Sequence, residues 1–184
     1  MTTPTPRRPL LPHNRRRRRP LVRILIVAGV VLVAAALLVF EPWALVIDRR
    51  VDEAAPAPSA PTAPQAPAAP IVLARGELIP HEHASTGSAV VLQLPDGSRV
   101  LRLEHLDTSD GPDLHVWLSD APVIAGGDGW HVFDDGRYID LGELKGNLGS
   151  SNYPIPADVD LAQLASVSIW CERFAVSFAA AALS

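Results

Sequence analysis

The sequence of 184 residues has a single cysteine, Cys171, and a single methionine, Met1. One cysteine excludes an intrachain disulfide, a cysteine-rich zinc site and a C-x-x-C-H haem attachment, although a disulfide between two chains stays open. The motifs G-x-S-x-G, the Walker loop and H-E-x-x-H are also absent. Because no catalytic motif is present, we expect that the chain is not an enzyme on its own.

Acidic residues are missing from the start of the chain and abundant in its second half. Residues 1–23 contain eight arginines and no acid, whereas residues 71–184 contain six basic and 16 acidic residues, a net charge of −10. Binding to nucleic acid requires a cationic face that neutralises phosphates. We therefore expect no nucleic-acid partner.

Polar side chains are absent from the 17 residues between Ile24 and Phe40. Residues 21–40 would form a helix of about 30 Å, the thickness of the hydrocarbon layer of a bilayer. Trp43 follows where an interfacial aromatic is expected, and the arginines before the run predict a cytoplasmic N-terminus. The sequence thus predicts a single-pass protein of the cell membrane with an extracytoplasmic C-terminal part.

Two alternatives for this hydrophobic run are a cleaved signal peptide and a buried core helix. A signal peptide has a shorter apolar region and a small-residue cleavage site, and no A-x-A pattern follows closely here. A core helix rarely has uniform hydrophobicity and flanking arginines. We expect an uncleaved signal anchor, which divides the chain into a basic cytoplasmic tail (1–20), a transmembrane anchor in the lipid bilayer (21–40), an interfacial segment with a linker (41–70) and a folded domain (71–184).

The linker is rich in proline and alanine: residues 51–70 contain six prolines and eight alanines. Closely spaced prolines exclude a helix and favour polyproline II, which at about 3.1 Å per residue would extend roughly 60 Å. We expect a disordered but stiff spacer that holds the domain away from the membrane. A polyproline ligand for another domain is the alternative, but no basic residue flanks a P-x-x-P core.

Residues 71–184 show hydrophobic alternation with period two, which is typical of strands. The segment Ser88–Leu94 is predicted to place Val90, Leu92 and Leu94 on its inner face. Pro95-Asp96-Gly97-Ser98 has turn chemistry, and Arg99–Leu103 then directs Leu101 and Leu103 inward. This pair of strands predicts a β-hairpin.

Two later segments show the same alternation. Asp113–Ser119 is predicted to direct Leu114, Val116 and Leu118 inward and His115 and Trp117 outward; Val167–Cys171 separates Val167, Ile169 and Cys171 from Ser168 and Trp170. Many short strands with close turns predict an all-β domain, an antiparallel β-sandwich or a barrel-like fold.

Several ordered motifs in this region resemble one known family. They are Gly76 with His83 and Gly87; Gly111-Pro112-Asp113-Leu114 followed by Val116 and Leu118; Leu141-Gly142-Glu143-Leu144-Lys145-Gly146-Asn147; Asn152-Tyr153-Pro154-Ile155-Pro156; and Val167-Ser168-Ile169-Trp170-Cys171 with Phe174, Val176 and Phe178. Residues 71–184 resemble the DM-thirteen domain, a small all-β extracytoplasmic module often found beside DOMON domains.

The resemblance implies a role in electron transfer, with Cys171 as a naked thiol or as a ligand to a group such as haem. A lone thiol in an oxidising compartment also fits a redox residue. We therefore expect an electron-transfer accessory module that uses Cys171, with or without a bound haem or metal, and that meets a redox or cell-envelope protein partner. Cys171, His83 and Trp170 are the candidate cofactor-binding residues.

Histidines supply further candidate ligands. His81-Glu82-His83 would present two imidazoles on one face of an extended segment, which predicts a metal site at His81 and His83. A non-covalent haem would take its axial ligand from Cys171, His83, His105, His115 or His131, with Trp117, Trp130, Trp170, Phe133 or Tyr153 in its pocket. The sequence allows a haem or a transition metal and requires neither.

Other metal sites fit the sequence poorly. A blue-copper site is excluded because no histidine follows Cys171 and the domain has no methionine. Asp107, Asp110, Asp113, Asp134 and Asp135 lack the EF-hand spacing and are expected to be turn residues. A different functional class also stays open: a non-catalytic surface binding or adhesion module in which Cys171 is a small buried core residue.

Overall fold

In the computed structural model, residues 18–40, 47–56 and 69–184 are described, with side chains from residue 20 onward. The chain forms two compact units, Met1–Phe40 and Glu41–Ser184. Most of the basic tail, Trp43 and the middle of the proline-rich stretch lie outside the described residues.

Helix α1 (Arg18–Phe40) contains the long hydrophobic run. Its segment Pro20–Phe40 has 21 residues and is apolar enough to cross a membrane by length and composition. At about 1.5 Å per residue it exceeds the roughly 30 Å of a hydrocarbon core. From residue 24 to residue 40 the helix is apolar on every side, because small and branched aliphatic residues follow one another without a polar stripe.

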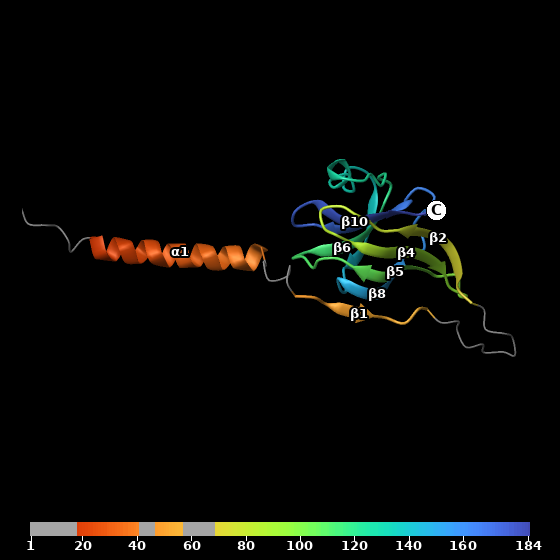
Figure 1. Ribbon diagram of the computed structural model, residues 1–184, viewed down its shortest axis with the longest axis horizontal. Helices are drawn as coiled ribbons and strands as arrows, with labels where there is room; N and C mark the ends of the chain where they lie inside the picture. Colours follow the sequence, from red (N-terminus) through yellow and green to blue (C-terminus); the bar gives the residue numbers. More distant parts are fainter. Residues whose placement is uncertain (1–17, 41–46, 57–68) are drawn as a thin grey trace, which may run out of the picture. The chain divides into compact units, whose positions relative to one another are not determined.

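The second unit is a sandwich of two sheets, as the sequence predicts (Figure 1). The first sheet has the order β1-β8-β5-β4-β2 and the second has the order β3-β10-β9-β6-β7. All pairings are antiparallel except the parallel pair of β1 and β8. The strands are β1 (Arg50–Asp52), β2 (Ile71–Glu77), β3 (Ile79–Pro80), β4 (Thr86–Gln93), β5 (Arg99–Asp107), β6 (Leu114–Ser119), β7 (Tyr138–Glu143), β8 (Leu148–Ile155), β9 (Ser166–Cys171) and β10 (Val176–Ala182).

The main core lies between the two sheets and is built from the alternate residues that face inward. The first sheet contributes Leu101, Leu103 and Tyr153, and the second contributes Leu114, Val116, Leu118, Val167, Ile169 and Phe178, all at most 3% exposed. The predicted inner faces of β5, β6 and β9 are therefore confirmed. Burying side chains of this size contributes about 1.5–3 kcal/mol each.

The predicted hairpin forms between β4 and β5, but the inner face of β4 differs from the prediction. Ala89 and Val91 belong to the main core, whereas Val90 pairs with Arg102, on the opposite face of the sheet. The reason is local: four apolar residues in a row, 89–92, satisfy either register, so alternation alone does not choose between them. The turn itself matches its chemistry, since Asp96 Oδ1 accepts hydrogen bonds from the Ser98 amide and hydroxyl.

Part of the segment expected to be a linker belongs to the folded domain. Strand β1 pairs with β8, with Val51 opposite Gly149. A Cβ at Gly149 would clash with the Val51 carbonyl, so the glycine permits the close approach of the two strands. The proline- and alanine-rich stretch therefore joins two strands of one sheet, β1 and β2, instead of only preceding the domain.

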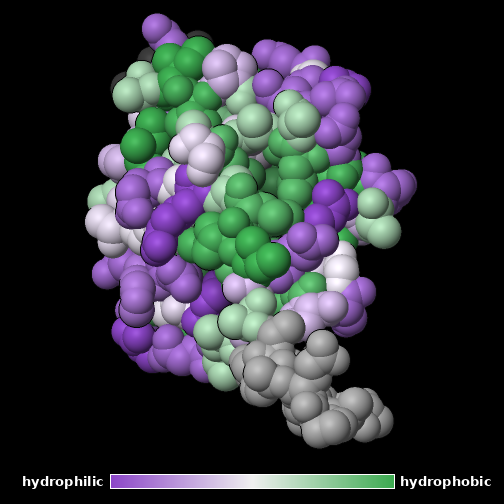
Figure 2. All heavy atoms as spheres, turned by 90° about the vertical axis from the view of Figure 1, so that its right-hand side faces the viewer, coloured by the Kyte–Doolittle hydropathy of each residue, from purple (hydrophilic) through white to green (hydrophobic). Residues whose placement is uncertain are grey.

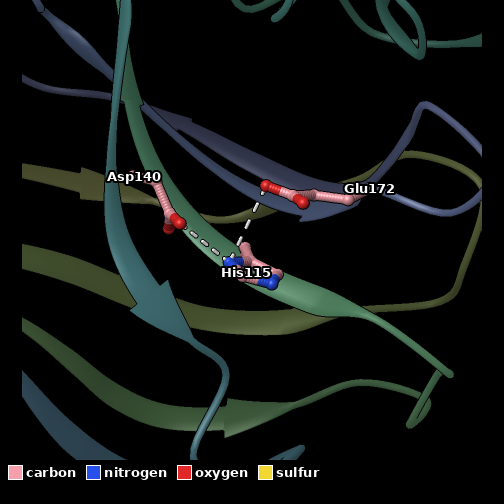
Figure 3. Close-up of side chains that lie close together, drawn as sticks. All are labelled: His115, Asp140 and Glu172. Carbon is pink, nitrogen blue, oxygen red and sulfur yellow. Dashed lines mark hydrogen bonds and ion pairs between the residues drawn. The ribbon is translucent and has the colours of Figure 1, made fainter.

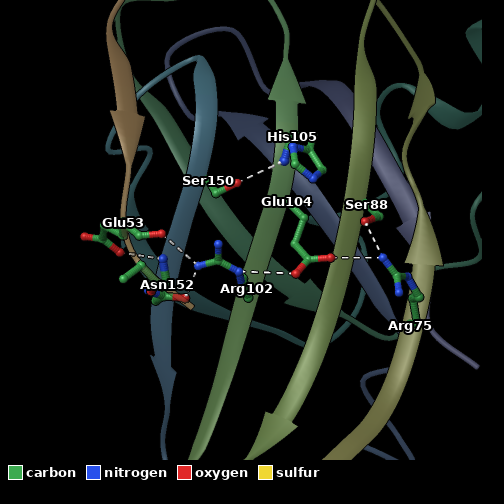
Figure 4. A network of polar contacts seen from close by, with 9 residues as sticks. Glu53, Arg75, Ser88, Arg102, Glu104, His105, Ser150 and Asn152 are labelled. Atoms are coloured by element: carbon green, nitrogen blue, oxygen red, sulfur yellow. Dashed lines mark hydrogen bonds and ion pairs between the residues drawn. The ribbon is translucent and has the colours of Figure 1, made fainter. Parts of the chain in front are cut away.

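Polar contacts hold β1 in place (Figure 4). The Glu53 carboxylate accepts hydrogen bonds from Lys145 Nζ at 2.8 Å and from the Asn152 amide at 2.7 Å. Arg102 Nη1 donates to the Glu53 carbonyl at 3.1 Å and to Asn152 Oδ1 at 2.9 Å.

Arg49, the residue just before β1, forms a bidentate salt bridge with the buried Asp110 carboxylate, and both N···O distances are 2.7 Å. Such charge-assisted bonds are the stronger class of hydrogen bond.

Apolar side chains also reach the surface of the domain. Figure 2 shows a hydrophobic area in the middle of one face, bordered by hydrophilic residues. Ile71, Val72 and Leu73 at the start of the edge strand β2 are 61%, 57% and 43% exposed. Edge strands with exposed apolar side chains are sites where other chains can add.

Candidate functional site

Cys171 is the last residue of β9, a strand that lies between β6 and β10 in the second sheet. Its cross-strand neighbours are Leu114 and Val176, and all three side chains face the main core. The exposed fraction of Cys171 is 0%. The lone thiol is therefore sealed from solvent on the inner face of the sheet.

The environment of the Cys171 thiol disfavours its ionised form. Burial raises the pKa of this thiol, and the negative charges of Asp113 and Glu82 add to the effect; the backbone amides of Phe174 and Arg173 partly offset it. At neutral pH the group is a protonated thiol, the form that reacts poorly with oxidants and alkylating reagents.

A haem does not fit at Cys171 with this packing. A macrocycle would have to reach Sγ through Leu114 and Val176, which are both 3% exposed and belong to the same core cluster. Displacing such residues would open the close-packed interior between the sheets. Any redox role of Cys171 in this fold is therefore that of a buried thiol.

Trp170, the residue before Cys171, faces the opposite side of the sheet. It belongs to a second cluster on the outer face, with Trp117, Phe133, Ala121 and Ala180. The segment between β6 and β7 covers this cluster, because Phe133 and Ala121 both come from it. Trp170 is 1% exposed and Phe133 is 0% exposed, so the outer face of the second sheet is as dry here as the inner face.

The rings of this outer cluster form a stack that leads to the surface. Trp117 lies parallel to Tyr138, with ring centroids 3.9 Å apart and an interplanar angle of 8°. On its other side Trp117 stacks on Trp170 at 5.0 Å. Tyr138 is 42% exposed, whereas Trp117 is 3% exposed. The stack therefore runs from a solvent-accessible phenol to an indole that adjoins Cys171 in the chain.

His81 and His83 have different surroundings. His81 is 7% exposed, its Nδ1 lies 2.9 Å from Ser177 Oγ, and its buried Nε2 makes no hydrogen bond of good geometry with the part of the chain that the structure describes. Burial lowers the pKa of His81, so the imidazole is neutral near pH 7. His83 instead packs against Phe178, with ring centroids 3.9 Å apart and an interplanar angle of 32°. The structure gives the two imidazoles different partners, and the metal site at His81 and His83 stays a prediction.

The other histidines of the domain, His105, His115 and His131, are spread over it. His131 Nδ1 contacts the Ala175 carbonyl at 2.7 Å, and His105 has a positive φ of 52° with its amide bonded to Ser150 Oγ. His115 lies on the outer face of β6, where its Nδ1 is 3.0 Å from Asp140 Oδ2. These side chains therefore do not converge on Cys171. Asp110, one of the five aspartates predicted to be turn residues, forms a salt bridge with Arg49.

Sequence reasoning missed the group formed by His115, Asp140 and Glu172 (Figure 3). The sequence suggests His115 only as a haem ligand, and no motif connects it with the two acids, which are 32 residues apart in the chain. The sequence gives little indication of this group, because β7 and β9 become neighbours of β6 only when the strands pair in the folded domain.

Comparison with known proteins assigns the sequence of the β domain to a family. A family model described as "Electron transfer DM13" matches residues 77–183, from the end of β2 through β10. No curated protein and no solved structure matches the chain. The matched residues include Cys171, the aromatic stack and the group around His115. Because the model covers more than half of the sequence, the chain belongs to the electron transfer DM13 family.

Proposed function

We propose that this protein is a membrane-anchored electron-transfer module that exchanges single electrons with a redox partner. The family assignment supports an electron-transfer role, and the length and apolar character of α1 support a membrane anchor. The arginines of the N-terminal tail favour a cytoplasmic N-terminus, with the β domain on the extracytoplasmic side.

The stack of Tyr138, Trp117 and Trp170 is the observation that carries the proposal. Electrons pass between aromatic rings that are close together, and these centroids are 3.9 Å and 5.0 Å apart. A partner docked at the exposed Tyr138 would thus be connected to the interior of the second sheet. Because the Cys171 thiol is sealed from water, any electron it gives or takes must pass through such a protein path.

The proposed step moves one electron. It leaves the Cys171 sulfur and travels through Trp170 and Trp117 to Tyr138, and the proton that the thiol loses reaches solvent only when the packing around Cys171 opens. A one-electron oxidant on the partner is reduced there, and each ring returns to its initial state. Cys171 is then the redox thiol and Trp170 the group next to it, while neither a haem nor a metal is needed for this path.

A photochemical experiment on the full chain in detergent tests the proposal. A ruthenium polypyridyl complex, oxidised by a flash and a quencher, serves as the one-electron oxidant, and transient absorption follows the tryptophan and tyrosine radicals. We expect Trp117→Phe, which keeps an aromatic ring in the cluster, to slow electron transfer at least tenfold. Trp130→Phe is the matched control, because Trp130 packs against the main core outside the stack. Equal rates in the two variants would overturn the proposed path.

A second function, a binding module without redox activity, is favoured by the burial of Cys171. Its 0% exposure and its place between Leu114 and Val176 suit a small core residue. The same flash experiment separates the two functions. If Cys171→Ala leaves the yield and lifetime of the aromatic radicals unchanged, the thiol supplies no electron, and the binding function becomes the better account.

A further inference from the structure

Three strands of the second sheet bring an imidazole and two carboxylates together at one end of its outer face (Figure 3). His115 lies on β6, Asp140 on the neighbouring β7, and Glu172 directly follows β9 on the other side. One nitrogen or oxygen atom from each of the three side chains lies within 4.8 Å of the others. The pairing of β6 with β7 holds His115 and Asp140 at a fixed spacing, and a backbone hydrogen bond to Asp113 holds Glu172 beside them.

The spacing of the ligand atoms suits a metal ion. His115 Nδ1 lies 3.0 Å from Asp140 Oδ2 and 3.9 Å from Glu172 Oε1. An ion about 2.0–2.2 Å from each ligand holds the ligand atoms of a tetrahedral site roughly 3.3–3.6 Å apart. The two distances from His115 Nδ1 lie a few tenths of an ångström on either side of this range. Glu172 has a side chain that is 43% exposed, so it is free enough to close the remaining gap by a rotamer adjustment.

Hydrogen bonds orient these ligands toward one another. Asp140 Oδ1 accepts a bond from the Gly142 amide at 2.8 Å, which leaves Oδ2 for the shared site. Asp113 Oδ1 lies 3.7 Å from His115 Nε2, the ring nitrogen that does not face Asp140. His115 Nδ1 lies within hydrogen-bond distance of Asp140 Oδ2, and a metal ion bound there would take the place of the proton between these two atoms. The Glu172 amide donates to the Asp113 carbonyl at 3.0 Å and fixes the spacing of these two residues. A carboxylate behind a ligating histidine is the usual support of a metal site.

The charge of the group favours a divalent cation. Asp113, Asp140 and Glu172 are three carboxylates around one imidazole, so acidic side chains outnumber basic ones in the group. The imidazole nitrogen selects transition ions over calcium and magnesium, which prefer oxygen ligands alone. We propose that His115, Asp140 and Glu172 form a site for a divalent transition metal ion such as Zn²⁺, with Asp113 as the supporting carboxylate.

Solvent has access to the proposed site. The side chains of Asp140 and Glu172 are 37% and 43% exposed, whereas that of His115 is 14% exposed. Three protein ligands leave at least one position of a tetrahedral ion for water or for a group from a partner. On the β9 side, Trp170 is the register partner of His115. The site therefore adjoins the aromatic cluster, and indole fluorescence can report its occupancy.

Zinc titration of the full chain tests the site without reference to electron transfer, because Zn²⁺ is not redox-active. The protein is purified in detergent without a polyhistidine tag, stripped with chelator, and titrated with Zn²⁺ by calorimetry. We expect one ion per chain, and at least a tenfold weaker affinity in Asp140→Asn and in Glu172→Gln. Excess Ca²⁺ should not displace the Zn²⁺. Substitution of Co²⁺ should quench tryptophan fluorescence in the parent protein more than in Glu172→Gln.

His131→Ala is the matched control, since His131 is an exposed histidine bonded to the Ala175 carbonyl. It should bind Zn²⁺ like the parent chain. Glu172→Gln replaces an exposed side chain outside the core, so it keeps the test informative if a His115 variant fails to fold. Absence of Zn²⁺ binding, or binding that survives both acid substitutions, would overturn the proposal. Binding lost only in His83→Ala would assign the ion to His81 and His83 instead.

Discussion

The outer faces of the two sheets are stabilised in different ways. On the first sheet, Arg102 and Glu104 form a polar network with Arg75, and all these groups find charged or amide partners (Figure 4). On the second sheet, Trp117 and Trp170 are buried beneath a covering segment with an apolar cluster of their own. On the first face, polar groups hold β1 against the sheet. The second face contains the aromatic rings and the His115 group, which are the candidate functional residues.

The largest effect should come from truncating the aromatic cluster. Trp170→Ala removes a ring that is 1% exposed and should lower the free energy of unfolding by about 3–5 kcal/mol, as for other buried tryptophans. Urea unfolding of the full chain, followed by circular dichroism, measures the change. Val72→Ala, at a side chain 57% exposed, should stay within about 0.5 kcal/mol. A small effect at Trp170 would mean that the outer cluster contributes little to the fold.

The polar face should respond less strongly. Arg102→Ala removes the donors to Asn152 Oδ1 and to the Glu53 carbonyl and should cost about 1–3 kcal/mol. Arg50→Ala is the matched control, because its ion pair with Asp52 is exposed at both side chains and should be worth under about 1 kcal/mol. Amide hydrogen exchange should show β1 opening in the first variant. If the amides of Arg50–Asp52 stay equally protected in Arg102→Ala, the polar network does not hold β1 in place.

Substitution of Cys171 tests the packing of the inner face, for comparison with the aromatic cluster on the outer face. Cys171→Ser places a hydroxyl in an apolar site and should cost about 1–3 kcal/mol, more than Cys171→Ala does. The native thiol should react with maleimide only as fast as the domain opens, since it is 0% exposed. Rapid labelling in the folded state would contradict the packing around Cys171.

The smallest effect concerns Glu53 and the pH. Its hydrogen bond with Lys145, helped by the Asn152 amide, lowers the pKa of Glu53. A carboxyl with a lowered folded pKa stabilises the fold above its unfolded pKa of about 4.3, and this contribution disappears as the pH falls through the folded value. Glu53→Gln should therefore remove under about 1 kcal/mol at pH 7 and nothing at low pH. An equal loss at pH 2 and pH 7 would exclude the ion pair as the cause.

Much of the sandwich could be predicted because alternation is a local property. Leu114, Val116 and Leu118 alternate with polar or aromatic residues, and the structure buries them as expected. Alternation failed at residues 89–92, where an unbroken apolar run fits both faces of β4. It also gave no sign of β1, a strand of three residues whose pairing depends on the glycine at position 149.

The candidate site was predictable only in part. The family motif pointed to Cys171, and the strand pattern correctly put Cys171 and Trp170 on opposite faces. The stack with Tyr138 and the approach of Asp140 to His115 depend on which strands flank β6. A single sequence contains no signal for that order, because strand pairing is a long-range choice.

The sequence by itself determined the apolar segment long enough to cross a membrane, the all-β class, the family and the inward direction of Cys171, since each follows from local hydropathy, period-two alternation or contiguous motifs. Only the tertiary structure decided that residues 50–52 complete the first sheet, that the thiol is sealed by Leu114 and Val176, and that His115 meets two carboxylates. The physical reason is that register and strand order bring together residues distant in the chain, and the energies that select them come from packing across the whole sandwich.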